Sequence, residues 1–296
     1  MLNAKGNQQP PFPFNAGCQA DKQFSSAYDA VFMSFLALYE QSPGWHHSWE
    51  QHSPEIAGHF AGSFEELSRH SDNSSKTDLK KAFSKHRDNF RIRLCQIQAE
   101  KFPEGGKSVS AKTILEVIFG GDQGPYLEQS LLCSKCQTST EEKISFPDLC
   151  AKAIPGATFV RLLEQHFSRF VEDAQKNPHQ QECPSCKGEN EVQEVKIPGV
   201  PWFWLNRGKS TSTIPCLDLT FRSGSQDLKY SLGSVIYLTG KNKYSARLRD
   251  RLGKWWWYDS LARSGSPVPD DVQHPQELCQ AGKEGEAVAL IYRLDA

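Results

Sequence analysis

Residues 234–260 read SVIYLTGKNKYSARLRDRLGKWWWYDS, and they contain β-branched and aromatic runs separated by turn signals. With the residues just before them, they predict three strands, at 229–240, 243–250 and 253–260. Runs of the same character occur at 192–197, 201–206, 217–221 and 287–294. The chain after Cys186 is therefore expected to form an antiparallel sheet.

The first half of the chain is predicted to be mainly helical. Apolar residues recur at helical spacing in AYDAVFMSFLALY (27–39), and Ser26 with Asp29 resembles a capping box at its start. Helices are also expected at 78–98, 111–119 and 157–174, the last with an apolar stripe. Two polar stretches, 69–78 and 262–271, are expected to be surface loops. Helices followed by strands indicate an α+β protein, with a helical lobe packed on the sheet.

Composition excludes several classes of function. Of the 296 residues, 38% are hydrophobic, which is typical of a folded protein. The formal net charge is −1, so the overall electrostatic field does not attract nucleic acid or an anionic membrane. No apolar run approaches the length of a membrane span. The N-terminus has no continuous apolar core, so it is not a secretory signal. Nine cysteines without an export signal favour reduced thiols, and hence a cytoplasmic or nuclear protein.

Four of the cysteines form two CxxC pairs, Cys133/Cys136 and Cys183/Cys186. Two such pairs supply the four thiolates of one tetrahedral structural Zn²⁺, and a closed Cys₄ site leaves no position open for catalysis. Reduced thiols or a single redox CxxC are the alternatives. The other cysteines read as small buried hydrophobic residues: Cys18, Cys95, Cys150, Cys216 and Cys279.

The order of these motifs resembles the ubiquitin-specific protease family of papain-like cysteine proteases. FGGDQGPYLEQSLLCSKC (119–136) resembles the family's approach to its first zinc knuckle, CPSC (183–186) its second, and IPGVPWFWLNR (197–207) the strand that follows. The resemblance implies a helical thumb (about 20–120), zinc-pinned β fingers (about 121–200) and an antiparallel β palm (about 197–296). Together these would form one domain, 20–296, after a flexible lead, 1–19.

Carried over residue by residue, the resemblance indicates a degenerate catalytic site. Asp259 matches the family's acid, but Lys243 stands at the position of the base histidine in GKNKY (240–244). Aligned with fungal-type versions of the first box, Ser26 stands at the position of the nucleophilic cysteine; another alignment places Ala27 there. Tyr244, Trp256 and Trp257 would line the channel for the ubiquitin tail.

The chemistry of these replacements disfavours catalysis. Serine needs a base, and at a pKa near 10.4 about one lysine in two thousand is neutral at pH 7. Ser26 also reads as a helix N-cap, Lys243 as a surface lysine paired with Asp259, and Asp259 as an acceptor in a turn. Cys18 is an alternative nucleophile, although it precedes the helix start by eight residues.

Three functions follow as hypotheses. The first is an inactive member of the family, a pseudo-deubiquitinase that binds ubiquitin, a ubiquitin-like protein or another protein. The second is an active or substrate-trapping isopeptidase with its nucleophile at Ser26 or Cys18. The third is a scaffold module in a larger complex with no ubiquitin contact.

Overall fold

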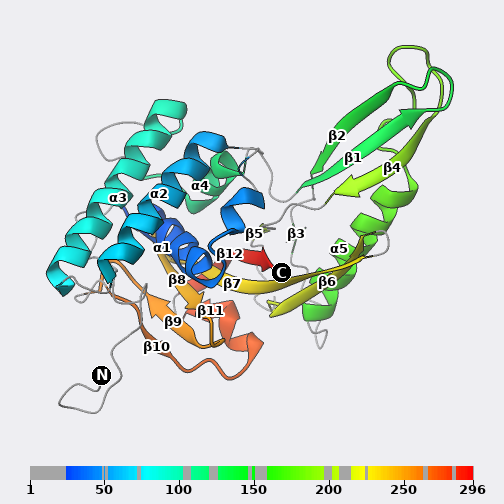
Figure 1. Ribbon diagram of the computed structural model, residues 1–296. Helices are drawn as coiled ribbons and strands as arrows, with labels where there is room; N and C mark the ends of the chain where they lie inside the picture. Colours follow the sequence, from blue (N-terminus) through cyan, green and yellow to red (C-terminus); the bar gives the residue numbers. More distant parts are fainter. Residues whose placement is uncertain are drawn as a thin grey trace.

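Helix α1 (Ser26–Gln41) lies between a helical lobe and one face of a large β-sheet (Figure 1). The computed structural model describes residues 25–48, 50, 53–71, 75–102, 108–119, 126–145, 149–150, 159–196, 202–206, 215–223, 226–262, 266–281 and 285–295. Residues 26–38 of α1 are all buried, which is the pattern of a helix covered on every side. This helix therefore joins the two parts of the molecule.

The rest of the helical lobe consists of α2 (Pro54–Ser71), α3 (Lys76–Ile97), α4 (Ala111–Ile118) and the short 3₁₀ helix η1 (Trp45–Ser48). A cluster of aromatic rings holds α1 to α2 and α3, with Phe32 at its centre. The ring of Phe32 lies 5.2 Å from the rings of Phe64 and Phe83 and 5.8 Å from that of Phe60. No helix in the described ranges is both long and apolar enough to cross a membrane.

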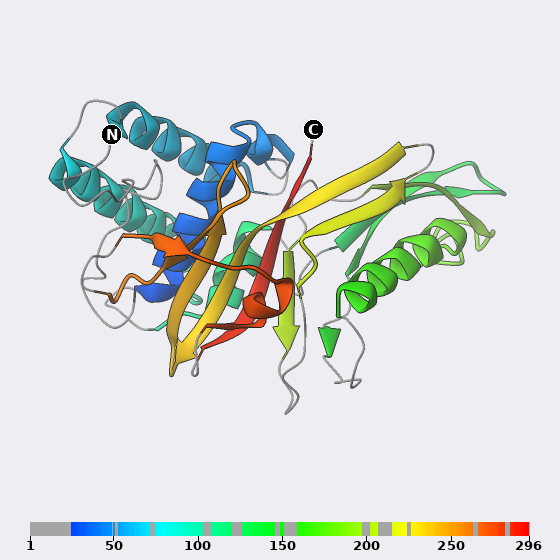
Figure 2. The same cartoon turned by 90° about the horizontal axis from the view of Figure 1, so that it is seen from below.

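The large sheet has the strand order β10-β9-β8-β7-β12-β5-β3 (Figure 2). Its strands are β3 (Leu149–Cys150), β5 (Trp202–Asn206), β7 (Gln226–Gly240), β8 (Lys243–Arg249), β9 (Trp255–Tyr258), β10 (Val268–Asp270) and β12 (Gly285–Leu294). Neighbours pair antiparallel except β3 with β5. Strand β6 (Asp218–Ser223) pairs with β7, and β11 (Gln280–Ala281), which follows η2 (Pro275–Cys279), pairs with β12.

Close packing joins α1 to the middle of this sheet. A Cβ atom on Gly233 of β7 would lie 2.3 Å from Cδ2 of Leu38, so only glycine fits there without a shift. One residue further, the hydroxyls of Ser34 and Ser234 are hydrogen-bonded at 2.7 Å in the buried contact. The C-terminal end of α1 lacks basic residues of its own, and Arg251 and Arg293 donate hydrogen bonds to the carbonyls of its last residues, Glu40 and Gln41.

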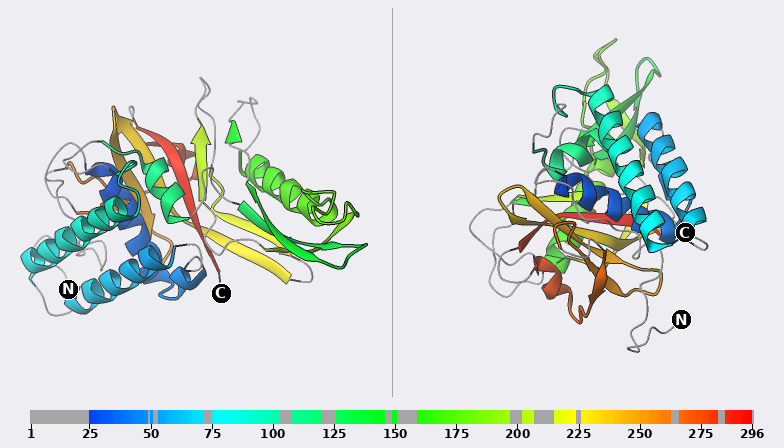
Figure 3. Two further views of the ribbon diagram at one scale, coloured as in Figure 1. Left: turned by 90° about the horizontal axis from the view of Figure 1, so that it is seen from above. Right: turned by 90° about the vertical axis from the view of Figure 1, so that its left-hand side faces the viewer.

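A second, three-stranded sheet extends away from the lobe (Figure 3). It has the order β2-β1-β4, from β1 (Tyr126–Cys133), β2 (Ser139–Ser145) and β4 (Asn190–Lys196). Helix α5 (Phe159–Lys176) packs on this sheet and on β6. Val171 and Ala174 of α5 belong to the same hydrophobic core as Tyr230 and Tyr292 of the large sheet. The base of the fingers is therefore continuous with the palm.

The predicted α+β architecture is confirmed: a helical thumb, a mainly antiparallel palm and three-stranded fingers occur in the expected order. Each of the seven runs predicted as strands overlaps an observed strand. The expected loop at 69–78 is wrong at both ends, because α2 extends to Ser71 and α3 begins at Lys76. The expected loop at 262–271 contains the short strand β10, which pairs with β9.

Candidate functional site

The first residue of α1 meets the turn that joins β7 to β8. This is a two-residue turn, Lys241-Asn242, in which Asn242 adopts a left-handed φ of 60°, a conformation that asparagine tolerates better than most residues. The hydroxyl of Ser26 accepts a hydrogen bond from the backbone N–H of Tyr244 at 3.1 Å and donates one to the carbonyl of Asn242 at 3.4 Å. The positions proposed for the nucleophile and the base are thus neighbours in space.

Ser26 is not the N-cap that the sequence predicts. Helix α1 begins at Ser26 itself, its N-cap is Ser25, and the Ser25 side chain makes no capping hydrogen bond to the backbone. The Ser25 hydroxyl donates to the carboxylate of Asp29 at 3.0 Å instead. The hydroxyl of Ser25 therefore donates its hydrogen bond to a buried carboxylate, and its oxygen does not cap the free backbone N–H groups of the first helical turn.

Lys243 is exposed at the start of β8, and its backbone pairs with Gly240 across the turn. The ion pair expected between Lys243 and Asp259 does not occur among the described residues, although both belong to them. The backbone carbonyl of Lys243 accepts a hydrogen bond from the Thr239 hydroxyl at 3.3 Å.

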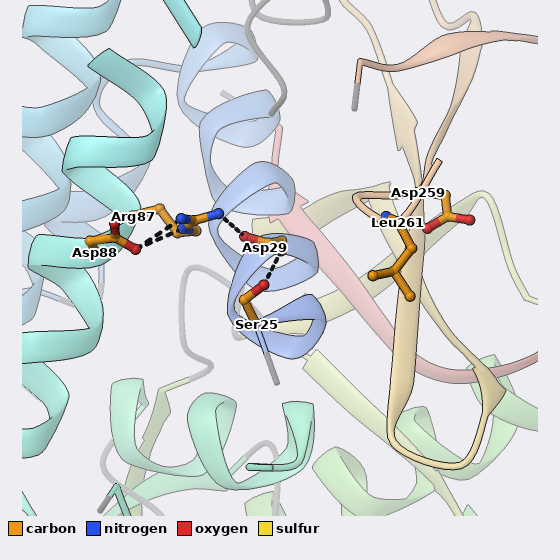
Figure 4. Close-up of polar contacts among 6 residues, drawn as sticks. All are labelled: Ser25, Asp29, Arg87, Asp88, Asp259 and Leu261. Carbon is orange, nitrogen blue, oxygen red and sulfur yellow. Dashed lines mark hydrogen bonds and ion pairs between the residues drawn. The ribbon is translucent and has the colours of Figure 1, made fainter. Parts of the chain in front are cut away.

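Asp259 follows β9 and organises a turn, as the sequence predicts. Its carboxylate accepts a hydrogen bond from the N–H of Leu261 at 2.8 Å, and its carbonyl accepts one from the N–H of Ala262 at 3.1 Å. A carboxylate that bonds the backbone two residues later forms an Asx turn. Figure 4 shows Asp259 and Leu261 together, apart from the polar groups on α1 and α3.

A charged network that the sequence did not reveal anchors the first turn of α1. Arg87 of α3 lies 3.1 Å from the Asp29 carboxylate, and both side chains are completely buried; Arg87 also contacts Asp88 at 2.9 Å (Figure 4). Burial raises the pKa of Asp29, while the guanidinium of Arg87 opposes this rise. Ser260, next to Asp259, also lies close enough to lower the pKa of Asp29.

The three aromatic residues predicted to line a tail channel differ in exposure. Tyr244 and Trp256 are 5% and 6% exposed and belong to the core between the palm and the thumb, whereas Trp257 is half-buried. The indole N–H of Trp256 donates to the Asp250 carboxylate at 2.9 Å. The Arg247 guanidinium lies over the Trp257 ring at 5.8 Å. Of these three side chains, Trp257 has the most surface to offer a partner.

The four cysteines of the two CxxC pairs lie together at the end of the fingers that is remote from the palm. Their sulfur atoms all lie within 4.8 Å of one another, and the Sγ atoms of Cys133 and Cys186 are 3.4 Å apart. Four thiolates at such distances form a suitable donor set for one metal ion such as Zn²⁺. The predicted grouping of the four cysteines is confirmed.

The two knuckles are built alike. The residue after each pair, Gln137 and Lys187, has a left-handed φ near 60° (58° and 59°), and its N–H donates to the carbonyl of the first cysteine in its pair. A Cβ atom on Gly188 would lie 2.6 Å from Cβ of Lys135 and 3.0 Å from Sγ of Cys133, so the second knuckle approaches the first closely. The Thr138 hydroxyl lies 3.1 Å from Sγ of Cys136. Hydrogen bonds from the Thr138 side chain and backbone, with those of Cys186 and Cys133, lower the pKa of the Cys136 thiol to about 6.

The remaining cysteines show no comparable cluster among the described residues. Cys216 and Cys279 are buried and Cys95 is half-buried. Cys18, and the side chain of Cys150, lie outside the part of the chain that the structure describes. The hypothesis of a nucleophilic Cys18 is therefore not tested by the structure.

The comparisons with known proteins find similarity to solved structures but to no protein-family model and no curated protein. This chain is similar to a chain of the SAGA DUB module (Ubp8, Sgf11, Sus1 and Sgf73) bound to monoubiquitin, with 12% identity and a TM-score of 0.43, over 99% of this chain and 73% of that one.

Two Pan2 structures are also similar. The apo Pan2 pseudoubiquitin hydrolase–RNA exonuclease module of Saccharomyces cerevisiae has 13% identity and a TM-score of 0.48, over 98% of this chain and 56% of that chain. The Pan2 catalytic unit of Neurospora crassa (protease and nuclease domain) has 11% identity and a TM-score of 0.45, over 99% of this chain and 60% of that one. This chain thus spans little more than half of the Pan2 chains. At such identities the likeness does not extend to function.

Proposed function

We propose that this chain is a ubiquitin-specific-protease-like domain that binds a protein partner, ubiquitin or a ubiquitin-like protein, without cleaving it. The observation that carries the proposal is the bonding of Ser26. Its hydroxyl proton is directed to the Asn242 carbonyl, and its oxygen is occupied by the N–H of Tyr244. A serine nucleophile needs a base that accepts this proton, and a peptide carbonyl is not one.

Two further features support this proposal. Ser26 is 1% exposed, so a scissile peptide has no access to its oxygen. Lys243, at the position of the base, is exposed to solvent. A Ser–Lys pair acts as a catalytic dyad when its lysine is desolvated, and the exposure of Lys243 disfavours this.

The four cysteines are proposed to bind one Zn²⁺ with a structural role. The symmetric knuckles support this role, since both position their sulfurs through the same turn and the same backbone hydrogen bond. Zinc held by four thiolates would fix the tip of the fingers and leave the catalytic positions untouched. Such a site requires reduced thiols, which favours the cytoplasm or the nucleus.

Hydrolysis of a fluorogenic ubiquitin C-terminal conjugate tests the absence of catalysis. We expect no release above the rate without protein, at high protein concentration and with zinc present. Release that disappears in Ser26→Ala or in Cys18→Ala would contradict the proposal and identify the nucleophile. Titration of ¹⁵N-labelled ubiquitin with the unlabelled protein tests binding, and unchanged ubiquitin spectra would favour a scaffold without ubiquitin contact.

A further inference from the structure

The two knuckles at the tip of the fingers contain two accessible thiols and two buried ones. Cys133 and Cys183, the first cysteines of their pairs, are 0% and 1% exposed. The second cysteines differ from them, because Cys136 is exposed and Cys186 is half-buried. An oxidant that arrives from solvent therefore meets the second sulfur of each knuckle, while the first sulfur is shielded.

The sulfurs approach one another across the knuckles, and each approach joins an accessible thiol to a buried one. The Sγ atoms of Cys133 and Cys186 are 3.4 Å apart, and those of Cys136 and Cys183 are 3.7 Å apart. Since a disulfide has an S–S length of about 2.05 Å, each pair needs to close by only about 1.5 Å. Glycine at position 188 permits this approach, because a Cβ atom on Gly188 would lie 3.0 Å and 3.3 Å from the sulfurs of Cys133 and Cys186.

Backbone hydrogen bonds hold the two knuckles in this relative position. The N–H of Ser134 donates to the carbonyl of Glu189 at 2.9 Å, and the Ser134 hydroxyl donates to the same carbonyl at 3.0 Å. The pairing of β1 with β4 extends as far as Cys133 and Asn190. The main chain itself therefore brings the sulfur pairs together, and their approach does not depend on a bound ion alone.

We propose that the tip of the fingers is a site of reversible oxidation, at which a peroxide converts the four thiols into two disulfides, Cys133–Cys186 and Cys136–Cys183. The inference rests on the proposed Zn²⁺ site in one respect, the release of the ion, because the thiolates that would bind it are consumed. The connectivity of the disulfides depends on the positions of the sulfurs alone.

Each disulfide forms in two steps and transfers two electrons to the peroxide. The accessible thiolate, that of Cys136 or Cys186, attacks one peroxide oxygen, breaks the O–O bond and becomes a sulfenic acid. The buried thiolate of the facing knuckle then attacks the sulfenic sulfur and forms the S–S bond. Hydroxide leaves in both steps and takes up a proton to become water. In total, four thiolates, two hydrogen peroxide molecules and four protons give two disulfides and four water molecules.

The experiment treats the purified, reduced protein with hydrogen peroxide. Zinc release is followed with a chromogenic chelator, and disulfides are mapped by peptide mass spectrometry. We expect about one equivalent of zinc to be released per chain as the two cross-knuckle disulfides form. Dithiothreitol followed by Zn²⁺ should restore the zinc-bound, reduced protein. Cys95→Ser is the control, since this half-buried thiol lies in α3 and its loss should leave release and connectivity unchanged.

Three outcomes would overturn the inference. The first is the formation of disulfides within the knuckles, Cys133–Cys136 and Cys183–Cys186. The second is oxidation of the four cysteines to sulfinic acids without any disulfide, and the third is retention of zinc and of reduced thiols through the treatment. If the untreated protein holds no zinc, the proposed Zn²⁺ site fails, and disulfide mapping of the same sample still tests the connectivity.

A second measurement tests whether oxidation keeps the two knuckles joined. Each disulfide would link the turn between β1 and β2 to the turn that precedes β4, whereas reduction and chelation leave neither an ion nor a covalent link. Tryptic cleavage after Lys135 and Lys187, which are both exposed, is expected to be about tenfold slower in the oxidised protein than in the reduced, chelated protein. Equal cleavage rates would show that the knuckles are not linked to each other and would overturn the inference.

Discussion

The guanidinium of Arg87 lies 3.1 Å from the carboxylate of Asp29, and neither side chain reaches solvent. Because α1 begins only three residues before Asp29, this ion pair holds the helix end that carries the candidate nucleophile position. Desolvation raises the pKa of the Asp29 carboxyl, and the charge of Arg87 compensates in part. The pair therefore fixes the geometry of the site more than it adds net stability.

Removing the positive charge should destabilise the protein strongly. Arg87→Met leaves the Asp29 carboxylate buried without its partner, and we expect a loss of about 3–5 kcal/mol in the free energy of unfolding. Urea denaturation followed by circular dichroism measures this change. Arg93→Met is the matched control, since the pair of Arg93 with Glu55 is partly exposed and should contribute about 1 kcal/mol or less. Equal losses in the free energy of unfolding for the two variants would contradict a buried ion pair between Arg87 and Asp29.

Replacement by alanine should change the stability of the protein in opposite directions at two glycines. Gly233 lies against α1, whereas Gly62 lies in open space on α2. Gly233→Ala places a methyl group 2.3 Å from Cδ2 of Leu38 and should destabilise the protein by about 1–3 kcal/mol. Gly62→Ala in α2 has no neighbour within 4 Å and should stabilise the protein by about 0.5–1 kcal/mol through helix propensity. Thermal unfolding of both variants checks the signs, and a neutral Gly233→Ala would show that α1 is not seated as described.

The zinc proposal predicts one metal ion per chain. Elemental analysis of the purified protein should give about one equivalent of zinc, and Cys183→Ser should lower it well below one. Cys95→Ser, which alters a half-buried cysteine of α3, should leave the zinc content unchanged. Retention of a full equivalent in Cys183→Ser would exclude the four-cysteine site.

Alkaline pH should destabilise the fold through buried tyrosines. Burial raises the pKa of the Tyr28 phenol to about 12, and it also raises the pKa values of Tyr230, Tyr237 and Tyr292. Above a pH of about 10 the unfolded chain loses phenolic protons that the folded chain keeps, so the unfolded state binds fewer protons and stability falls as pH rises. The stabilisation is fully present below pH 10.

Absorbance at 295 nm, which reports phenolate, checks this prediction. At pH 11 the native protein should show much less phenolate than the same protein in denaturant. A tyrosine titration that coincides in the two states would contradict the burial of these rings. Urea midpoints at pH 8 and pH 11 measure the accompanying loss of stability.

Sequence patterns correctly predicted the elements whose geometry depends on residues close together in the chain. The Asx turn at Asp259 and the knuckles after Cys136 and Cys186 depend on short-range geometry, so residue type and spacing suffice to find them. Helix α2 was missed although its signal was present: Pro54 stands at its first position, and Ile56, Phe60, Phe64 and Leu67 follow at helical spacing.

Contacts between distant segments could not be predicted in this way. Arg87 is 58 residues from Asp29 in the sequence. The Tyr244 amide is 218 residues from the Ser26 hydroxyl to which it donates a hydrogen bond. The resemblance implied β fingers over about 121–200, but no residue pattern marked β1 and β2 as strands. The run STEEKIS (139–145) is polar and forms a strand by pairing with β1. The N-cap lies at Ser25 rather than Ser26, and the Ser25 hydroxyl bonds the buried carboxylate of Asp29 instead of a backbone amide.

Strand β7 has a mechanical consequence for the molecule. It runs for 15 residues from its pairing with β6, near the finger base, to the turn at Lys241-Asn242 that touches Ser26. Strands β6, β8 and β12 all pair with β7 along this length. The base of the fingers and the first turn of α1 are therefore connected by one continuous strand.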